Sequence, residues 1–366
     1  MCIRDSPNTP NLDTPANIIW RGAFIDKKIV NKLIDEYKKI RPNVTILYEN
    51  VWNNSNNQRQ ELVKYQNDLN RILGGSNPLE VPDIFMVKNT WVGDYESRSV
   101  PHPTKTKASL QNEGYYEFIS EDFAKNGVVF GVPLWVDTFS IIVNKDLLQQ
   151  ESSINTIPTS LDSFQNFIKS INSNKIKPFA MGTARNVSFA FEFFQILLRT
   201  ENITFDANEA NLTNNFNFTN FKNAFQFFKS FLSSWSTAYN NDAAAFLKGE
   251  VIMIFQPSYR LREILRFNDL QNLQITIETA KVPYINQKFN VGDYWGLMVS
   301  KTSRYSKAAW DFIDWLSQNS QLQILNEEIK EENGYFGILF PKKELNSNYK
   351  EDKLLSTYVG ELDSVK

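Results

Sequence analysis

The chain has 366 residues, of which 42% are hydrophobic and 22% charged, a composition typical of globular proteins and a length that predicts two domains. Lys and Arg number 39 against 41 Asp and Glu, and the sequence has no dense basic stripe, so nucleic acid is not an expected partner. The only cysteine is Cys2 and the only histidine is His102, which argues against a disulfide framework or a zinc site. We expect no metal and no cofactor.

Residues 1–13 are expected to be a disordered or artefactual N-terminus. They contain Asp5, Pro7 and Pro10 and lack the apolar stretch of about 7 to 15 residues that a secretory signal carries. The most apolar segment, residues 127–143, is interrupted by Pro133 and falls short of the ~20 residues that span a bilayer. We therefore interpret it as buried strands.

Strand and helix patterns alternate along the first part of the chain. The apolar periodicity predicts, in order, strand 17–20, helix 26–40, strand 44–48, helix 58–73 and strand 83–87. The last of these is a compact apolar run, typical of a fully buried parallel strand. This order predicts an open α/β sheet, in which ligands bind beyond the carboxyl ends of the strands. Trp20, Asn89 and Trp91 stand at such ends and are candidates for contact with a ligand.

The alternation restarts in the second half, which predicts a second α/β domain. Strands are expected within residues 128–143, 177–181, 251–255 and 291–299, and helices at residues 162–171, 189–198, 216–232, 243–248 and from 306 onward. Thr159 and Asp162 match a capping box and predict the start of the first of these helices. The phenylalanines of 189–198 and 216–232 are expected to pack in the core.

Several short segments, in one order along the chain, carry a resemblance to a known family. They are residues 82–85, residues 131–133 followed by 137–138 and 143–147, residues 245–251, and residues 296–300 followed by 306–312. Together they resemble the extracellular solute-binding proteins of the family that includes maltose-binding protein. The resemblance implies an α/β, periplasmic-binding-protein-like fold, with two lobes joined by hinge crossings and a solute held in the cleft between them.

The resemblance also implies domain boundaries and partners. Lobe 1 is expected at residues 14–136 and 293–318, lobe 2 at 140–289 and 322–366, and the crossings at 136–139, 290–295 and 318–323. The protein is expected to be a bacterial, monomeric, non-enzymatic component of an ATP-binding-cassette importer that delivers its solute to the membrane permease subunits. The implied location is outside the cytoplasmic membrane, with a lipid anchor in the full-length form.

A sugar is the expected solute. Sugars offer apolar ring faces and a rim of hydroxyls, so their sites combine flat aromatic side chains with short polar ones. Trp91, Trp135 and Trp295 lie beside predicted strand ends or crossings, and Trp20 is a further candidate. For each of these tryptophans the alternative is packing in a core.

Asp137 is the leading polar candidate, because a carboxylate in an apolar strand is costly unless it is paired. A sugar hydroxyl, an internal salt bridge or a hinge hydrogen bond would each satisfy it. Asp293 follows Gly292 in a Gly-Asp-Tyr-Trp-Gly segment and is the second acidic candidate. The remaining polar or aromatic candidates are Tyr294, Asn89, Tyr259, Ser258, Thr183 and Arg185.

Three alternatives to a sugar-binding protein remain open. A polyamine-like cation held by Asp137 and Asp293 between aromatic faces would keep the transport role and change the solute. A glycoside hydrolase would use the same two residues as its catalytic carboxylates. Iron binding is disfavoured, since His102 and the scattered tyrosines form no ligand cluster.

Overall fold

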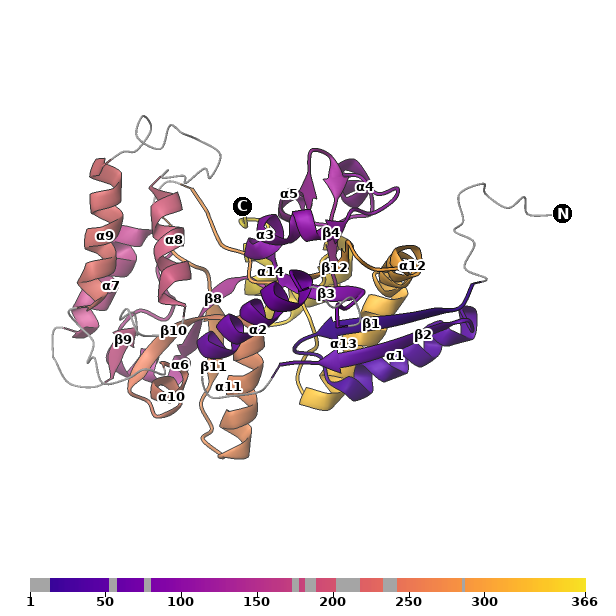
Figure 1. Ribbon diagram of the computed structural model, residues 1–366. Helices are drawn as coiled ribbons and strands as arrows, with labels where there is room; N and C mark the ends of the chain where they lie inside the picture. Colours follow the sequence, from indigo (N-terminus) through magenta and orange to yellow (C-terminus); the bar gives the residue numbers. More distant parts are fainter. Residues whose placement is uncertain are drawn as a thin grey trace. The chain divides into compact units, whose positions relative to one another are not determined.

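The computed structural model describes residues 14–52, 58–75, 80–172, 178–181, 189–201, 218–232, 242–284 and 287–366 (Figure 1). The chain divides into two compact units. Unit 1 comprises Met1–Val136, Tyr294–Glu332 and Phe336–Leu345, and unit 2 comprises Asp137–Asp293, Asn333–Tyr335 and Asn346–Lys366. The expected N-terminal segment 1–13 lies outside the described residues.

The chain passes from unit 1 to unit 2 after Val136 and returns after Asp293. Residues 318–323, the third crossing that the resemblance implies, lie inside unit 1 at the start of α13 (Asn319–Asn333). Further passages fall after Glu332, Tyr335 and Leu345. Which of these passages act as hinges stays a prediction.

Unit 1 contains a six-stranded sheet in the order β2-β1-β3-β12-β4, with β7 also paired to β12. Its strands are β1 (Ala16–Gly22), β2 (Val44–Asn50), β3 (Ile84–Lys88), β4 (Ser99–Val100), β7 (Gly131–Pro133) and β12 (Trp295–Ser300). The first three are parallel, and β12 runs antiparallel to β3 with Trp295 opposite Lys88. The start of β12 and the carboxyl ends of β1, β2 and β3 therefore share one edge of the sheet.

Helices pack on the sheet of unit 1. α1 (Lys27–Ile40) lies along β2, and α12 (Ser306–Leu316) packs on β1 and β12 (Figure 1). Asp26 starts α1 by accepting a hydrogen bond from the Lys28 amide at 2.6 Å. The other helical segments of this unit are α2 (Gln58–Leu73), η1 (Asn89–Trp91), α3 (Val92–Tyr95), η2 (Glu96–Arg98), α4 (Lys107–Asn112) and α5 (Glu117–Phe123). A short hairpin of β5 (Ala124–Lys125) and β6 (Val128–Val129) follows α5.

Unit 2 contains a four-stranded sheet in the order β11-β8-β10-β9. Its strands are β8 (Phe139–Asn144), β9 (Phe179–Met181), β10 (Val251–Pro257) and β11 (Ile277–Ala280). Every residue of β8 and β10 is buried, as the long apolar runs predicted. Its helices are α6 (Lys145–Glu151), α7 (Leu161–Asn172), α8 (Ala190–Thr200), α9 (Phe218–Leu232), α10 (Asp242–Leu247), α11 (Ser258–Leu270) and α14 (Leu355–Leu362). The 3-10 segment η3 (Lys343–Glu351) joins the two units.

Two expectations for unit 2 need correction. The capping box at Thr159 is wrong, because α7 begins at Leu161 and the Ser160 hydroxyl accepts from the Ser163 amide at 3.4 Å. The phenylalanines of α8 and α9 also divide between core and surface. Phe193 is buried against Phe255, whereas Phe191 and Phe218 are 67% and 70% exposed. Within the described ranges, no helix combines the length and apolarity needed to cross a membrane.

Candidate functional site

Five aromatic residues gather at the edge of the unit 1 sheet where the parallel strands end. Phe24 follows β1, Trp52 follows β2, Trp91 ends the turn after β3, and Trp295 opens β12. Tyr65 reaches the same place from α2. We refer to these five residues as the aromatic platform.

Trp295 is the centre of the aromatic platform. Its ring centroid lies 4.9 Å from that of Phe24, 5.2 Å from Trp91 and 5.6 Å from Tyr65. Phe24 in turn lies 4.4 Å from Trp52. Trp295 is 6% exposed, Trp52 and Trp91 are half-buried, and Phe24 is 43% exposed. The platform thus has a buried floor and three rings that reach the surface.

Asn89 and Tyr294 flank the platform and share one carboxylate. The Asn89 side-chain amide donates to Asp122 Oδ2 at 3.0 Å, and the Tyr294 hydroxyl donates to the same oxygen at 2.5 Å. Burial and the negative charge of Asp122 raise the pKa of the Tyr294 phenol well above its ordinary value. Tyr294 is fully buried and packs on Phe118 at 5.5 Å, so its side chain serves the packing of unit 1 next to Trp295 in the chain.

In unit 2, Asp137 starts helix α11. Its Oδ1 accepts from the amides of Thr138 at 2.8 Å and Ser258 at 2.9 Å. Its Oδ2 accepts from the Ser258 hydroxyl at 2.8 Å and the Tyr259 amide at 3.1 Å. Burial raises the pKa of Asp137 to about 7, while the hydrogen bonds from Ser258, Thr138 and Tyr259 act in the opposite direction. The structure thus supplies the internal partners that the sequence left open for this carboxylate; contact with a solute stays a prediction.

Asp293 and Tyr259 lie beside this helix start. The Asp293 amide donates to the Asp137 carbonyl at 2.9 Å, and both Asp293 and Tyr259 are half-buried. Burial, followed by the negative charge of Asp293, raises the pKa of Tyr259 well above its ordinary value. Four predicted residues, Asp137, Ser258, Tyr259 and Asp293, are therefore brought together at the amino end of α11.

The remaining candidates have different outcomes. Trp20 is fully buried between Tyr48 at 4.8 Å and Phe312 at 5.6 Å, which makes it a core residue of unit 1. Trp135 is half-buried, shortly before the passage into unit 2. Thr183 and Arg185 lie outside the described residues.

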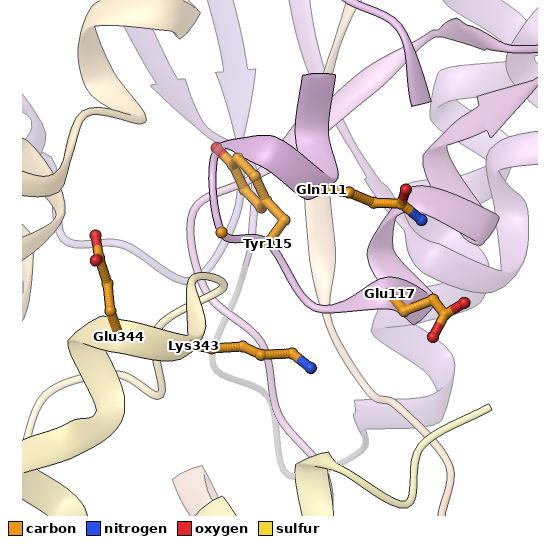
Figure 2. Close-up of a pocket in the computed structure, with 6 residues that line it drawn as sticks. Gln111, Tyr115, Glu117, Lys343 and Glu344 are labelled. Atoms are coloured by element: carbon orange, nitrogen blue, oxygen red, sulfur yellow. The ribbon is translucent and has the colours of Figure 1, made fainter. Parts of the chain in front are cut away.

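A separate shallow pocket of about 460 Å³ lies elsewhere in unit 1. Figure 2 shows that it is formed by the α4–α5 connection and the start of η3. Its lining residues are Gln111, Gly114, Tyr115, Glu117, Lys343 and Glu344. No predicted site residue lines this pocket. Among the residues with described positions, no group of three or more His, Cys, Asp or Glu side chains could hold a metal ion.

Sequence reasoning missed Phe24, Trp52, Tyr65 and Asp122. Phe24 and Trp52 each follow a parallel strand by two residues, so the rule that ligands bind at strand ends could have found them. Tyr65 and Asp122 lie on helices, and no local pattern distinguishes them from residues that serve packing or solvation.

Comparison with known proteins places the chain in a family. The sequence profile of the bacterial extracellular solute-binding protein family matches residues 22–323. No curated protein sequence matches the chain significantly.

Solved structures share the fold at low identity. The GacH receptor of Streptomyces glaucescens is 18% identical over 96% of this chain and 87% of its own, with a TM-score of 0.72. The sugar-binding protein MalE of Xanthomonas citri is 18% identical over 96% and 86%, with a TM-score of 0.70. The cyclic α-maltosyl-1,6-maltose binding protein of Arthrobacter globiformis is 17% identical over 96% and 88%, with a TM-score of 0.70.

The family profile covers most of the chain, and the two α/β units are those of a periplasmic-binding-protein fold. The chain belongs to the family of bacterial extracellular solute-binding proteins.

Proposed function

We propose that the protein captures a sugar or oligosaccharide outside the cytoplasmic membrane and delivers it to the permease subunits of an ATP-binding-cassette importer. The structural relatives support a sugar: the GacH receptor is described in complex with acarbose, and the Arthrobacter protein is named for a cyclic maltose derivative. Because these relatives are only 17 to 18% identical to this chain, its solute has to be inferred from its own residues.

The aromatic platform is the observation that carries the proposal. Phe24, Trp52 and Trp91 all reach the surface at one sheet edge, and each is held within 5.2 Å of a further platform ring. Stacking on a pyranose face would contribute ~0.5 to 1.5 kcal/mol per ring, by analogy with aromatic pairs. A linear oligosaccharide can use several such rings at once, whereas a monosaccharide can cover only part of the surface.

The environment of Asp137 supports a neutral solute over a cation. A polyamine site would need Asp137 and Asp293 as charged partners. The Asp137 carboxylate accepts four hydrogen bonds inside unit 2 and is 4% exposed, so its acceptor capacity serves helix α11. The same environment argues against a hydrolase, since a catalytic carboxylate must reach the reacting atoms. We therefore propose binding without catalysis.

The proposed contact residues are the exposed platform rings and the polar groups near them. On unit 1 they are Phe24, Trp52, Trp91, Trp295, Trp135 and Asn89; on unit 2 they are Tyr259 and Asp293, with Thr183 and Arg185 retained from the sequence. Asp137 and Ser258, each 4% exposed, are proposed to position Tyr259 at the start of α11. We leave out Trp20, because it is a core residue, and give Tyr294 a packing role. A monomeric state and a lipid anchor in the full-length form complete the proposal.

A thermal-shift screen tests the solute class. The purified protein is heated with glucose, maltotetraose, cellotetraose, spermidine or an amino acid mixture, because a ligand that binds only the folded state raises the melting temperature. We expect saturable stabilisation by an oligosaccharide, little change with added salt, and no hydrolysis of the bound sugar. Stabilisation by spermidine alone would replace the sugar by a cation, and turnover of the oligosaccharide would refute the non-enzymatic assignment.

A further inference from the structure

Phe24 occupies a strained three-residue turn. The Ile25 amide donates to the Ala23 carbonyl at 2.9 Å, which closes a γ-turn around Phe24. The φ angle of Phe24 is +71°, in the region that glycine adopts freely and a bulky side chain disfavours. This combination corresponds to the rare, strained form of the γ-turn.

Burial and hydrogen bonds fix the backbone on both sides of the turn. Ala23 and Ile25 are 0% and 3% exposed. The Ile25 carbonyl accepts hydrogen bonds from the Tyr48 hydroxyl and the Asn50 side-chain amide, both at 3.1 Å. The Val51 amide donates to the Gly22 carbonyl, also at 3.1 Å. The surroundings thus over-determine the turn and force the side chain between the two buried residues outward.

Contacts with Trp52 at 4.4 Å and Trp295 at 4.9 Å favour a ring at position 24, whereas the backbone conformation and the exposure of the side chain oppose one. Glycine would remove the backbone strain, and a polar residue would suit the 43% exposure of the side chain. Among the other non-glycine residues with positive φ, Asn126 and Asn272 are of the type that best tolerates it, the partly buried Phe189 packs against Phe139 at 5.2 Å, and Gln274 is polar and exposed. Phe24 instead presents its ring at the surface of the aromatic platform.

We propose that the strained turn is retained for solute recognition: it holds Phe24 outward as a specificity-determining stacking residue, against Trp52 and Trp295, and lowers the stability of the unliganded protein. Strained backbone of this kind concentrates at functional sites, where the rest of the structure compensates for it. The inference rests on the proposed sugar-binding function and adds a cost in stability that this function alone does not require.

The matched pair Phe24→Ala and Phe24→Gly separates strain from ring contact. Both variants lose the ring, but only glycine relieves the positive φ. We expect the unliganded Gly variant to melt about 2 to 4 °C above the Ala variant, the reverse of the ordinary order for these residues. Titration with maltotetraose, or with the oligosaccharide that the screen selects, should show roughly two- to tenfold weaker binding for both, and Phe24→Tyr should restore most of the affinity.

Each outcome decides a separate point. An Ala variant that melts at or above the Gly variant would show that the turn stores no strain and would overturn the inference. Wild-type affinity in both variants would also overturn it, while leaving the proposed function intact. If the wild-type protein binds no sugar in the screen, the proposed function fails and the assigned role of Phe24 fails with it.

Discussion

Asp137 illustrates how a buried carboxylate can serve a fold. The sequence identifies it as a residue that must be paired, because a carboxylate in an apolar strand is costly. The structure pairs it with the adjacent Thr138 and with Ser258 and Tyr259 at the start of α11. Asp137 thereby takes the place of a local N-cap, because Pro257 provides no capping side chain. Residues far apart in the sequence cannot be matched as donor and acceptor by inspection, so the partner could not be predicted.

Asp137 also leads to a prediction about pH. Its folded-state pKa of about 7 lies above the value of about 3.9 for an unfolded chain, so the native state binds this proton more tightly. The sign follows: stability from this group is greatest below pH ~4 and falls as the pH rises to about 7, by at most ~1.4 kcal/mol per unit. Urea unfolding of the wild type and Asp137→Asn between pH 4.5 and 7.5 measures this pH dependence of the unfolding free energy. The difference between the two unfolding free energies should change with pH; parallel pH profiles would contradict the assignment.

The tryptophans show how far residue-level reasoning reaches. Trp91 and Trp295 are separate predictions from two strand ends, and the structure brings their rings to 5.2 Å. Trp20 lies on the same face of β1 as the buried Ile18 and Gly22, two residues away on either side, so the period of two places it on the core face. That alternation was a better indicator than its place at a predicted strand end, because the strand continues two residues further.

At the scale of elements, two glycines of the unit 1 sheet leave the space in which a ring of α5 packs. A Cβ atom at Gly296 of β12 would lie 2.3 Å from the Phe123 ring, and one at Gly131 of β7 would lie 2.5 Å from it. The neighbouring Asp122 holds Asn89 and Tyr294 beside Trp295. The packing of one aromatic ring therefore connects α5 to the platform.

Gly296→Ala should accordingly destabilise the protein. Phe123 is fully buried and cannot move without disturbing the sheet, so overpacking should cost about 1 to 3 kcal/mol of unfolding free energy. Gly360→Ala in α14 is the matched control: nothing lies within 4 Å of an added Cβ, and the change should be neutral or stabilise by about 0.5 to 1 kcal/mol. Denaturant unfolding measures both, and equal stability of the two variants would contradict the packing argument.

The order and type of the long elements were predictable, and their ends less so. Residues 58–73 were expected as a helix and form α2, because two glycines stop the pattern. The strand predicted at residues 44–48 extends to Asn50 in β2. The sequence periodicity gives no stop signal there, and pairing with β1 determines where the strand ends. Trp52 follows this end, which is one reason that it was missed.

At the scale of the whole molecule, each unit is built from distant parts of the chain. β12 lies between β3 and β4 in the sheet of unit 1, although more than 190 residues separate β12 from β4 in sequence. A fragment of residues 14–136 would lack this central strand. The backbone groups of β3 that pair with β12 would then be left without hydrogen-bond partners at a new edge of the sheet.

We therefore expect residues 14–136 alone to fail to fold, and the same fragment joined by a short linker to residues 294–345 to fold. The joined chain should show dispersed amide resonances and a cooperative thermal transition, and the shorter one should show neither. Cooperative unfolding of the 14–136 fragment by itself would contradict the assembly of unit 1 described above.

The family was predictable from the order of short segments, and its profile confirms it over residues 22–323. The solute was harder to predict, because the proposed binding surface consists of side chains that four strands and one helix bring to a single edge of the sheet. Phe24 and Tyr65 both contact Trp295 in the structure. The position of Phe24 after a strand could have pointed to it, whereas Tyr65 lies on a helix with no local sign of binding.

Isothermal titration with the oligosaccharide that most stabilises the protein tests most directly whether the aromatic platform binds sugar. The titrated proteins are the wild type, Trp91→Ala and, as a matched control, Phe267→Ala, which removes a ring 53% exposed on α11 of unit 2. We predict a roughly two- to tenfold higher Kd for Trp91→Ala and an unchanged Kd for Phe267→Ala. Wild-type affinity in Trp91→Ala would contradict the account.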